Sequence, residues 1–209
     1  MNHIIYRKSS ILKKFHWILY CTRKRSVKSG AVVSRRGTKR RSRMRRLRAA
    51  ALSEVELAMD IINQAKAHLR AQGIDQWQTG YPDRDCLERD VRTGKGYFLE
   101  EDGIPLGYLC VDFDGEPAYD HLNGTWAREE PYVVVHRLAL SDAARGRGAA
   151  GTAFQLVEDL CRDRGGREFR VDTDAGNHKM QHILAKQGFQ YRGTIRFDNS
   201  EKIAYEKLL

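Results

Sequence analysis

The fold is constrained most by one stretch in the middle of the chain, where a predicted buried strand, a glycine-rich turn and an amphipathic helix follow one another directly. Residues 132–140 read YVVVHRLAL, an almost continuous run of β-branched and apolar side chains that predicts a central strand. Residues 142–154 read DAARGRGAAGTAF, and apolar side chains then recur at helical spacing up to residue 161. Because strand-to-helix connections are short and structured, the glycine-rich stretch is not a flexible linker, and the chain is predicted to fold as an α/β domain.

The glycine-rich turn predicts an anion site. Gly146, Gly148 and Gly151 allow the backbone to curl tightly and to approach a ligand without side-chain clash. The helix that follows offers free N–H groups and the positive end of its dipole, which together suit a pyrophosphate, and Arg145 and Arg147 add positive charge. No G-K-[ST] follows, so the turn is not a Walker loop. Residues 146–151 do read G-x-G-x-x-G, but they follow a strand in the middle of the chain and not an early one, so we do not take them as a dinucleotide fingerprint. A purely structural glycine turn is the alternative.

Charge is distributed unevenly along the 209 residues. The formal net charge is +10, yet residues 1–50 contain 17 Lys and Arg and no Asp or Glu. Residues 51–209 therefore carry 20 basic and 27 acidic side chains, a net charge of −7. These numbers describe a basic arm on a mildly acidic body, and we divide the chain into an extension over 1–43 and a folded domain over 44–209.

The basic extension has three interpretations. We expect a disordered segment, or one upstream of the true start, for which Met44, the first residue of the first predicted strand, is the natural candidate. Its Arg-rich, Ser-containing and acid-free composition is also typical of a transit peptide. As a third possibility, its Lys and Arg clusters would contact nucleic acid phosphates.

Cysteine spacing and hydropathy exclude several classes of protein. The four cysteines form no C-x-x-C pair and have no histidine at ligand spacing, so we expect free thiols, no metal site and a cytoplasmic location; they are Cys21, Cys86, Cys110 and Cys161. No apolar run approaches the ~18–20 residues of a transmembrane helix, so no membrane partner is expected.

The rest of the domain alternates between strands and helices. Strands are predicted at 44–52, 95–101, 105–113, 167–173, 189–197 and 201–209, and helices at 53–71, 83–92 and 177–188. Ser53 and Glu56 form a predicted capping box, and the dipeptide Asp102-Gly103 predicts a hairpin. Residues 114–131 are polar and irregular. The predicted order is β-α-α-β-β-β-α-β-α-β-β, an α/β (α+β) fold with a mixed sheet.

Several of these motifs together resemble one enzyme family. The stretch RGRGAA (145–150) resembles the [QR]-x-x-G-x-[GA] signature of the GNAT N-acetyltransferases, and the similarity extends through 136–151 and 172–193. It covers about 44–209 in the family's element order, and GIDQWQTGYP (73–82) is similar to a group of bacterial members. The resemblance implies the GNAT, or acyl-CoA N-acyltransferase, fold. It also implies direct transfer of an acetyl group from acetyl-CoA, without a metal, to an amine of a small molecule or protein in a ternary complex.

The same resemblance implies which residues bind the cofactor. The backbone amides of the glycine-rich turn would cradle the pyrophosphate; they belong to Arg145, Gly146, Arg147, Gly148, Ala149, Ala150 and Gly151. The backbones of Leu138 and Leu140 would bond the pantetheine arm. Asn177 matches the family asparagine that opens the next helix and contacts the cofactor, although a simple helix N-cap is the alternative.

The catalytic groups are less well defined. His136 lies where polyamine-type relatives often place a carboxylate, and its ordinary pKa of about 6.5 suits a general base; a structural histidine is the alternative. His121 and Asp172 are further candidates for the base. The usual tyrosine acid is absent, because that position is Leu184.

Three other tyrosines are candidates for the general acid, and a group of mainly aromatic residues is predicted to form the acceptor pocket. The tyrosines are Tyr119, Tyr132 and Tyr191; otherwise the thiolate leaves unassisted, since a thiol pKa is about 8.5. The predicted acceptor pocket, for which core packing is the alternative, contains Trp77, Tyr81, Tyr119, His121 and Trp126.

Two other functions stay open at this point. The acidic body favours a cationic amine acceptor and disfavours a tRNA-linked one. With Leu184 in place of the acid, the domain could instead bind acyl-CoA as a regulatory module with weak catalysis. Nucleic acid would be contacted only through the basic arm, and a homodimer is left open because dimers are common in the family.

Overall fold

The computed structural model describes residues 44–197 and 200–209. The predictions for the basic extension, for Cys21 and for the middle of the last polar turn lie outside the described residues. The three described cysteines, Cys86, Cys110 and Cys161, are free thiols, as expected.

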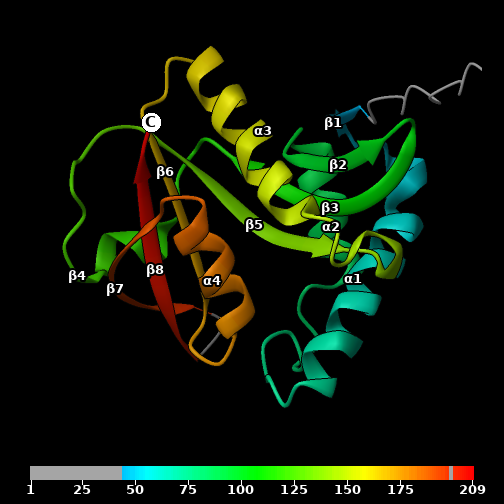
Figure 1. Cartoon of the computed structure of the whole chain (residues 1–209), viewed down its shortest axis with the longest axis horizontal. Coiled ribbons are helices and arrows are strands. Elements are labelled where there is room, and N and C mark those ends of the chain that lie inside the picture. Colours follow the sequence, from blue (N-terminus) through cyan, green and yellow to red (C-terminus); the bar gives the residue numbers. More distant parts are fainter. Residues whose placement is uncertain (1–43, 198–199) are drawn as a thin grey trace, which may run out of the picture. The chain divides into compact units, whose positions relative to one another are not determined.

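The predicted order of elements is confirmed, with one short strand added (Figure 1). The first half contains β1 (Arg45–Ala49), α1 (Val55–Ala71), α2 (Arg84–Arg92), β2 (Gly96–Glu101) and β3 (Ile104–Asp112). The second half contains β4 (Asn123–Gly124), β5 (Tyr132–Leu140), α3 (Ala149–Asp163), β6 (Glu168–Asp174), α4 (His178–Lys186), β7 (Gln190–Phe197) and β8 (Ser200–Leu208).

The strands form one mixed sheet in the order β1-β2-β3-β5-β6-β8-β7-β4. All neighbours are antiparallel except β5 and β6, which are parallel because α3 crosses over between them. Their recorded pairing runs only from Tyr132↔Glu168 to Val134↔Arg170. Beyond that point the two strands part, and the second half of β5 has no strand partner on its β6 side among the described residues.

Helices cover both faces of the sheet, as the alternation of side chains along the strands requires. Leu99 and Leu109 point to the core under α3 and α4, whereas their neighbours Phe98 and Tyr108 point to the core under α1 and α2. All four side chains are completely buried. In Figure 1, α3 and α4 cross in front of the strands.

The first α-helix begins two residues later than predicted. A 3₁₀ turn occupies Leu52–Glu54, and α1 begins at Val55. The carboxylate that reaches back to the chain entry is that of Glu54, which accepts from the Ala51 amide at 3.0 Å and is held by Arg48 at 2.7 Å. The predicted Ser53–Glu56 box is therefore not formed, because the arginine of the preceding strand fixes Glu54 in that role.

The structure adds detail to the segment predicted as irregular. It contains a 3₁₀ turn at Pro117–His121 and the two-residue strand β4, which pairs with β7. No helix among the described residues is long and apolar enough to cross a membrane.

Candidate active site

A cleft of about 170 Å³ opens where β5 and β6 separate. Its walls come from the end of α1 and the following loop, from the outer half of β5, from β6 and from the start of α4. The predicted site residues that line it are Trp77, Tyr81, His136, Leu138, Leu140, Arg145, Ala150 and Asn177. The cleft therefore joins the glycine-rich turn at one end to the predicted base at the other.

The glycine-rich turn leaves the N-terminus of α3 open. Gly148 is the N-cap residue, with φ of +69° and no side chain to cap the helix, and Gly146 has φ of +73°. Both need the left-handed conformation that glycine adopts freely, and neither has a heavy atom near its missing Cβ. The amide of Thr152 makes the first bond back to Gly148, at 3.2 Å. The amides at the helix start thus have no acceptor within the helix, which is the arrangement that binds anions.

The two arginines of the turn are occupied by protein groups. Arg145 pairs with Asp142 at 2.8 Å and donates to the carbonyl of Gln64 at 3.0 Å. Arg147 pairs with Glu101, and its carbonyl accepts from Arg45 at 3.1 Å. These side chains fix the shape of the turn, while the groups available to an anion are backbone amides.

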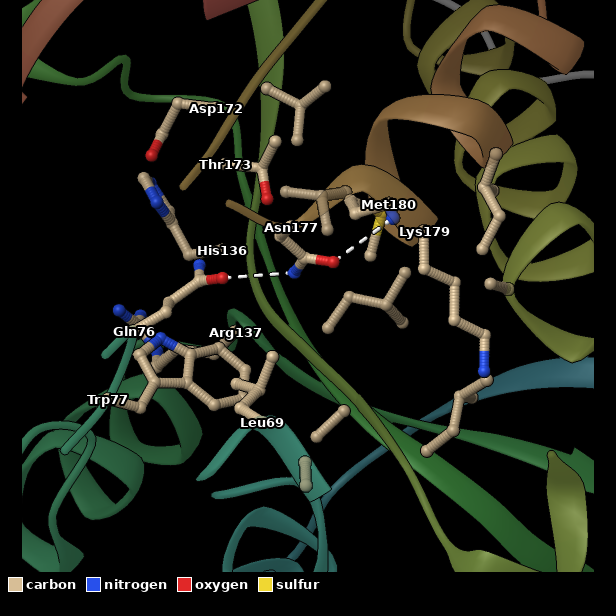
Figure 2. Close-up of a pocket in the computed structure, with 18 of the residues that line it drawn as sticks. Leu69, Gln76, Trp77, His136, Arg137, Asp172, Thr173, Asn177, Lys179 and Met180 are labelled. Atoms are coloured by element: carbon tan, nitrogen blue, oxygen red, sulfur yellow. Dashed lines mark hydrogen bonds between the residues drawn. The ribbon is translucent and has the colours of Figure 1, made fainter. Parts of the chain in front are cut away.

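Asn177 caps α4 and also connects it to the loop after α1 (Figure 2). Its Oδ1 accepts from the Met180 amide at 3.1 Å, so the N-cap interpretation is confirmed. Its Nδ2 donates to Oε1 of Gln76 at 3.0 Å. Contact of Asn177 with a cofactor stays a prediction.

His136 lies at the end of the cleft remote from the turn, and its side chain is only 9% exposed. Its Nε2 is 3.7 Å from a carboxylate oxygen of Glu116, and its ring stacks on Phe197 with centroids 6.4 Å apart. Burial lowers the pKa of His136 to about 3, with the charge of Arg137 acting in the same direction. The imidazole is therefore neutral at physiological pH and a weak proton acceptor, unlike the near-neutral base that the sequence suggested.

Asp172 faces the same end of the cleft from β6 (Figure 2). Its Oδ1 accepts from the hydroxyl of the buried Tyr119 at 2.9 Å. Burial raises the pKa of Asp172 to about 6, with Glu116 adding to the rise, while the Tyr119 hydrogen bond and Lys202 oppose it. From the sequence, Asp172 is only a secondary candidate for the base, because nothing local in the chain shows that this carboxyl is desolvated.

The other predicted acceptor residues are divided between three places. Trp77 and Tyr81 line the cleft, whereas Tyr119 and Trp126 line a second, separate depression. His121 is exposed on its 3₁₀ turn and lines neither cavity, so the structure does not bring it to the other site residues. Tyr119 contacts the cleft only indirectly, through Asp172.

No tyrosine proposed as the acid lines the described cleft. The hydroxyl of Tyr119 is bonded to Asp172, that of Tyr132 accepts from the Glu116 amide at 3.2 Å, and Tyr191 is 57% exposed on β7. Leu184 is completely buried in the core and does not line the cleft. Its neighbour Ile183 does line the cleft. The family's tyrosine position has therefore become a packing position in this chain.

Sequence reasoning missed Arg137 and Asp90. Arg137 lines the cleft next to His136 and is bound by the buried Asp90 of α2. Apart from its neighbour His136, Arg137 lies in a largely apolar strand, which is the one sequence signal that would have singled it out. Among residues 44–197 and 200–209, no group of three or more His, Cys, Asp and Glu is arranged to hold a metal ion.

Comparison with protein families gives one match. The model of the acetyltransferase (GNAT) family matches residues 62–189, which include the glycine-rich turn and most of the residues that line the cleft. No curated protein matches the chain significantly.

Solved structures give further similarities. A GNAT-family acetyltransferase from Streptococcus agalactiae is 36% identical, with a TM-score of 0.73 over 79% of this chain and 95% of its own. The aminoglycoside acetyltransferase AAC(6')-Ib in complex with coenzyme A is 17% identical, with a TM-score of 0.58 over 79% of this chain and 95% of its own. The PaiA N-acetyltransferase from Thermoplasma acidophilum, also in complex with coenzyme A, is 14% identical. Its TM-score is 0.59, over 79% of this chain and 99% of its own. At these identities the last two are similar in fold alone.

Proposed function

The chain belongs to the acetyltransferase (GNAT) family, and from this premise we propose that it is an acetyl-CoA-dependent N-acetyltransferase whose acceptor is a cationic amine. One observation carries the proposal: a single cleft has an open helix N-terminus at one end and the half-buried carboxylate of Asp172 at the other. The first suits the pyrophosphate of a nucleotide cofactor, and the second suits an amine that must lose a proton.

The residues at the first end fit coenzyme A. Open space at Gly146 and Gly148 and the unpaired amides at the start of α3 leave room for a pyrophosphate against the backbone. The unpartnered edge of β5 at Leu138 and Leu140 offers N–H and C=O groups to an extended amide-containing arm. When bound, acetyl-CoA supplies an acetyl group activated as a thioester. Backbone N–H groups of β5 would stabilise negative charge on its carbonyl oxygen.

At the second end, we assign the proton acceptor to Asp172 in preference to His136. A carboxylate with a pKa of about 6 is ionised at neutral pH and still basic enough to take a proton from an amine. With a pKa of about 3, the imidazole of His136 is uncharged at neutral pH, and in this role it would pack against the acceptor without repelling its positive charge.

The charge at this end favours a cationic acceptor. A carboxylate oxygen of Glu116 lies 3.7 Å from Nε2 of His136, and the charge of Glu116 also acts on Asp172. Two cations that line the cleft are neutralised by carboxylates, Lys202 by Asp174 at 3.2 Å and Arg137 by Asp90 at 2.6 Å. Trp77 and Tyr81 add aromatic surface, against which an ammonium group or its methylene neighbours can pack. One of the similar structures is an aminoglycoside acetyltransferase, which supports an amine acceptor in general terms.

A weakly catalytic acyl-CoA-binding module is the second candidate. It is favoured by Leu184, which is buried in the core where relatives carry a tyrosine, and by the absence of the three candidate tyrosines from the described cleft. Transfer without a protein acid is still chemically feasible, because a thiolate with a conjugate-acid pKa of about 8.5 is a moderate leaving group.

The two candidates are separated by a steady-state assay that follows thiol release from acetyl-CoA. The panel would contain monoamines, diamines, aminoglycosides, and peptides with a free N-terminus or lysine. We expect turnover with at least one cationic primary amine, at a rate that depends on acceptor concentration. Saturable binding of acetyl-CoA with no thiol release for any acceptor would overturn the enzyme and favour the binding module.

A further inference from the structure

A buried network beside the cleft ties β5 to α2 and to the loop after α1. Arg137 of β5 forms a two-point ion pair with Asp90 of α2, with Nε–Oδ2 at 2.9 Å and Nη2–Oδ1 at 2.6 Å. The remaining nitrogen, Nη1, donates to the hydroxyl of Tyr81 at 2.5 Å. The hydroxyl of Tyr108 donates to Asp90 at 3.0 Å. The arginine and aspartate side chains are 10% and 7% exposed, so removing either leaves the other charge buried without its partner.

Arg137 also occupies a strained backbone position. The register between β3 and β5 shifts between Tyr108 and Cys110, so that residues 137 and 138 face a single residue of β3. This is a β-bulge, and Arg137 has a φ of +57°, a conformation that glycine usually supplies at the first bulge position. A strained non-glycine residue persists only when surrounding interactions hold it in place. Here the Asp90 and Tyr81 contacts provide that hold.

The bulge changes which parts of β5 face the cleft. In a regular strand, alternate residues point to opposite faces. The cleft is instead lined by every residue from Val135 to Leu140. The bulge lies within this lining segment, where the strand has no β6 partner.

We propose that Arg137 and Asp90 are positioning residues: the pair clamps the left-handed bulge, which directs the backbone N–H groups of β5 at the acetyl oxygen. Through the Tyr81 hydroxyl, the same clamp holds one end of the loop that carries Gln76 and Trp77 over the cleft. This inference rests on the proposed acetyl transfer, because it names the residues that set the geometry of that step. Neither Arg137 nor Asp90 exchanges a proton with the substrate.

The first test compares Asp90→Asn and Arg137→Lys with the unaltered enzyme. Each keeps size and some polarity but breaks the two-point pair, so we expect kcat to fall about 100-fold while the KM for acetyl-CoA stays within about threefold. The matched control is Arg48→Lys, which breaks a two-point pair with Glu54 (2.7 and 2.8 Å) outside the cleft, and should leave kcat unchanged. If both test variants are folded and keep kcat within twofold of the unaltered enzyme, the clamp is overturned.

A second pair of variants separates the backbone from the side chain. Glycine adopts a φ of +57° without strain, whereas alanine is strained in that conformation and needs other contacts to hold it there. Arg137→Gly should therefore retain the bulge and have a kcat at least about tenfold above that of Arg137→Ala. Equal losses in the two variants would contradict the argument from strain.

Crystal structures of the variants give a readout that does not depend on turnover. We expect residue 137 to leave the left-handed region, and the β3–β5 register to become regular, in Asp90→Asn or Arg137→Ala. Retention of the bulge in both would overturn the clamp. If the unaltered protein transfers acetyl to no acceptor but the bulge is lost in these variants, the clamp stands as a determinant of β5 geometry and the proposed function fails.

Discussion

The two ends of the cleft offer different kinds of chemical group to a ligand, backbone amides at one end and side chains at the other. At the end formed by the glycine-rich turn, the groups offered to a ligand are backbone amides, and Arg145 and Arg147 are bound to other parts of the protein. At the opposite end, the groups offered are side chains from separate elements, with Asp172 on β6 and His136 on β5. A turn built from backbone has a local sequence signature, whereas a pocket built from distant side chains has none.

The two ends also differ in how their charges respond to pH. The open start of α3 presents fixed partial charges that do not change with pH. The opposite end contains titratable groups whose pKa values are moved by burial, upward for Asp172 and downward for His136. Changes at the first end should therefore act on cofactor binding, and changes at the second on rate and pH dependence.

The largest effect is expected for Asp172→Asn. Asparagine keeps an acceptor for the Tyr119 hydroxyl but cannot take a proton, so kcat should fall by about 1000-fold. In the unaltered enzyme, kcat/KM should be high above pH 6 and decline as the pH falls through about 6, where the carboxylate becomes protonated. The pH profile of the variant should lack this limb. Asp159→Asn, at an exposed carboxylate of α3, is the control, and an unchanged acid limb in Asp172→Asn would exclude Asp172 as the base.

A smaller effect, on binding alone, is expected for Gly148→Val. Valine is strained at a φ of +69°, and it narrows the turn, so the KM for acetyl-CoA should rise about 100-fold with little change in kcat at saturation. Gly165→Val makes the same change at a φ of +77°, also in open space, just beyond the other end of α3. If the control raised the KM equally, the effect would reflect lost stability and the backbone cradle would lose its support.

His136→Gln should have a modest effect. With a pKa of about 3 the imidazole stays neutral throughout an assay between pH 5 and 9, so kcat should fall less than about tenfold and the acid limb should stay in place. The measurement is the pH profile of kcat/KM. Loss of the limb in this variant would restore the histidine base predicted from the sequence and remove the assignment to Asp172.

The smallest effect is expected for Tyr119→Phe. The lost hydrogen bond normally lowers the pKa of Asp172 against the larger effect of burial, so the pKa should rise above about 6. The acid limb should then move to higher pH by less than about one unit, with a small change in maximal kcat. Tyr191→Phe, at an exposed tyrosine of β7, is the control, and a downward movement of the limb in Tyr119→Phe would contradict the hydrogen-bond assignment.

Most of the fold could be predicted because its signals are local. The apolar run of β5, the hairpin at Asp102-Gly103 and the N-cap Asp83 of α2 all have the predicted place, since each depends on residues a few positions apart. The prediction of the Ser53–Glu56 capping box was wrong because the contact that decides it is not local to the helix. Arg48 of the preceding strand binds Glu54, and a prediction made from the helix sequence alone does not include a partner from another element.

The candidate site was predictable only in part. Asn177 as a helix cap and the open turn at Gly148 follow from residues in or next to one helix. His121 and Tyr119 are predicted for the acceptor pocket because both lie in the polar segment 114–131, yet one is exposed and the other reaches the cleft only through Asp172. Arg137 and Asp90 are 47 positions apart, and their pairing depends on α2 packing against the sheet.

By itself, the sequence determined the element order, the glycine-rich turn before α3 and the family, because periodicity, turn chemistry and a contiguous motif are all properties of neighbouring residues. Only the tertiary structure decided which carboxylate is desolvated, which histidine is neutral, and which arginine holds the bulge of β5. The physical reason is that burial and charge pairing depend on what surrounds a group in space, and the groups around Asp172 come from the segment before β5, from β6 and from β8.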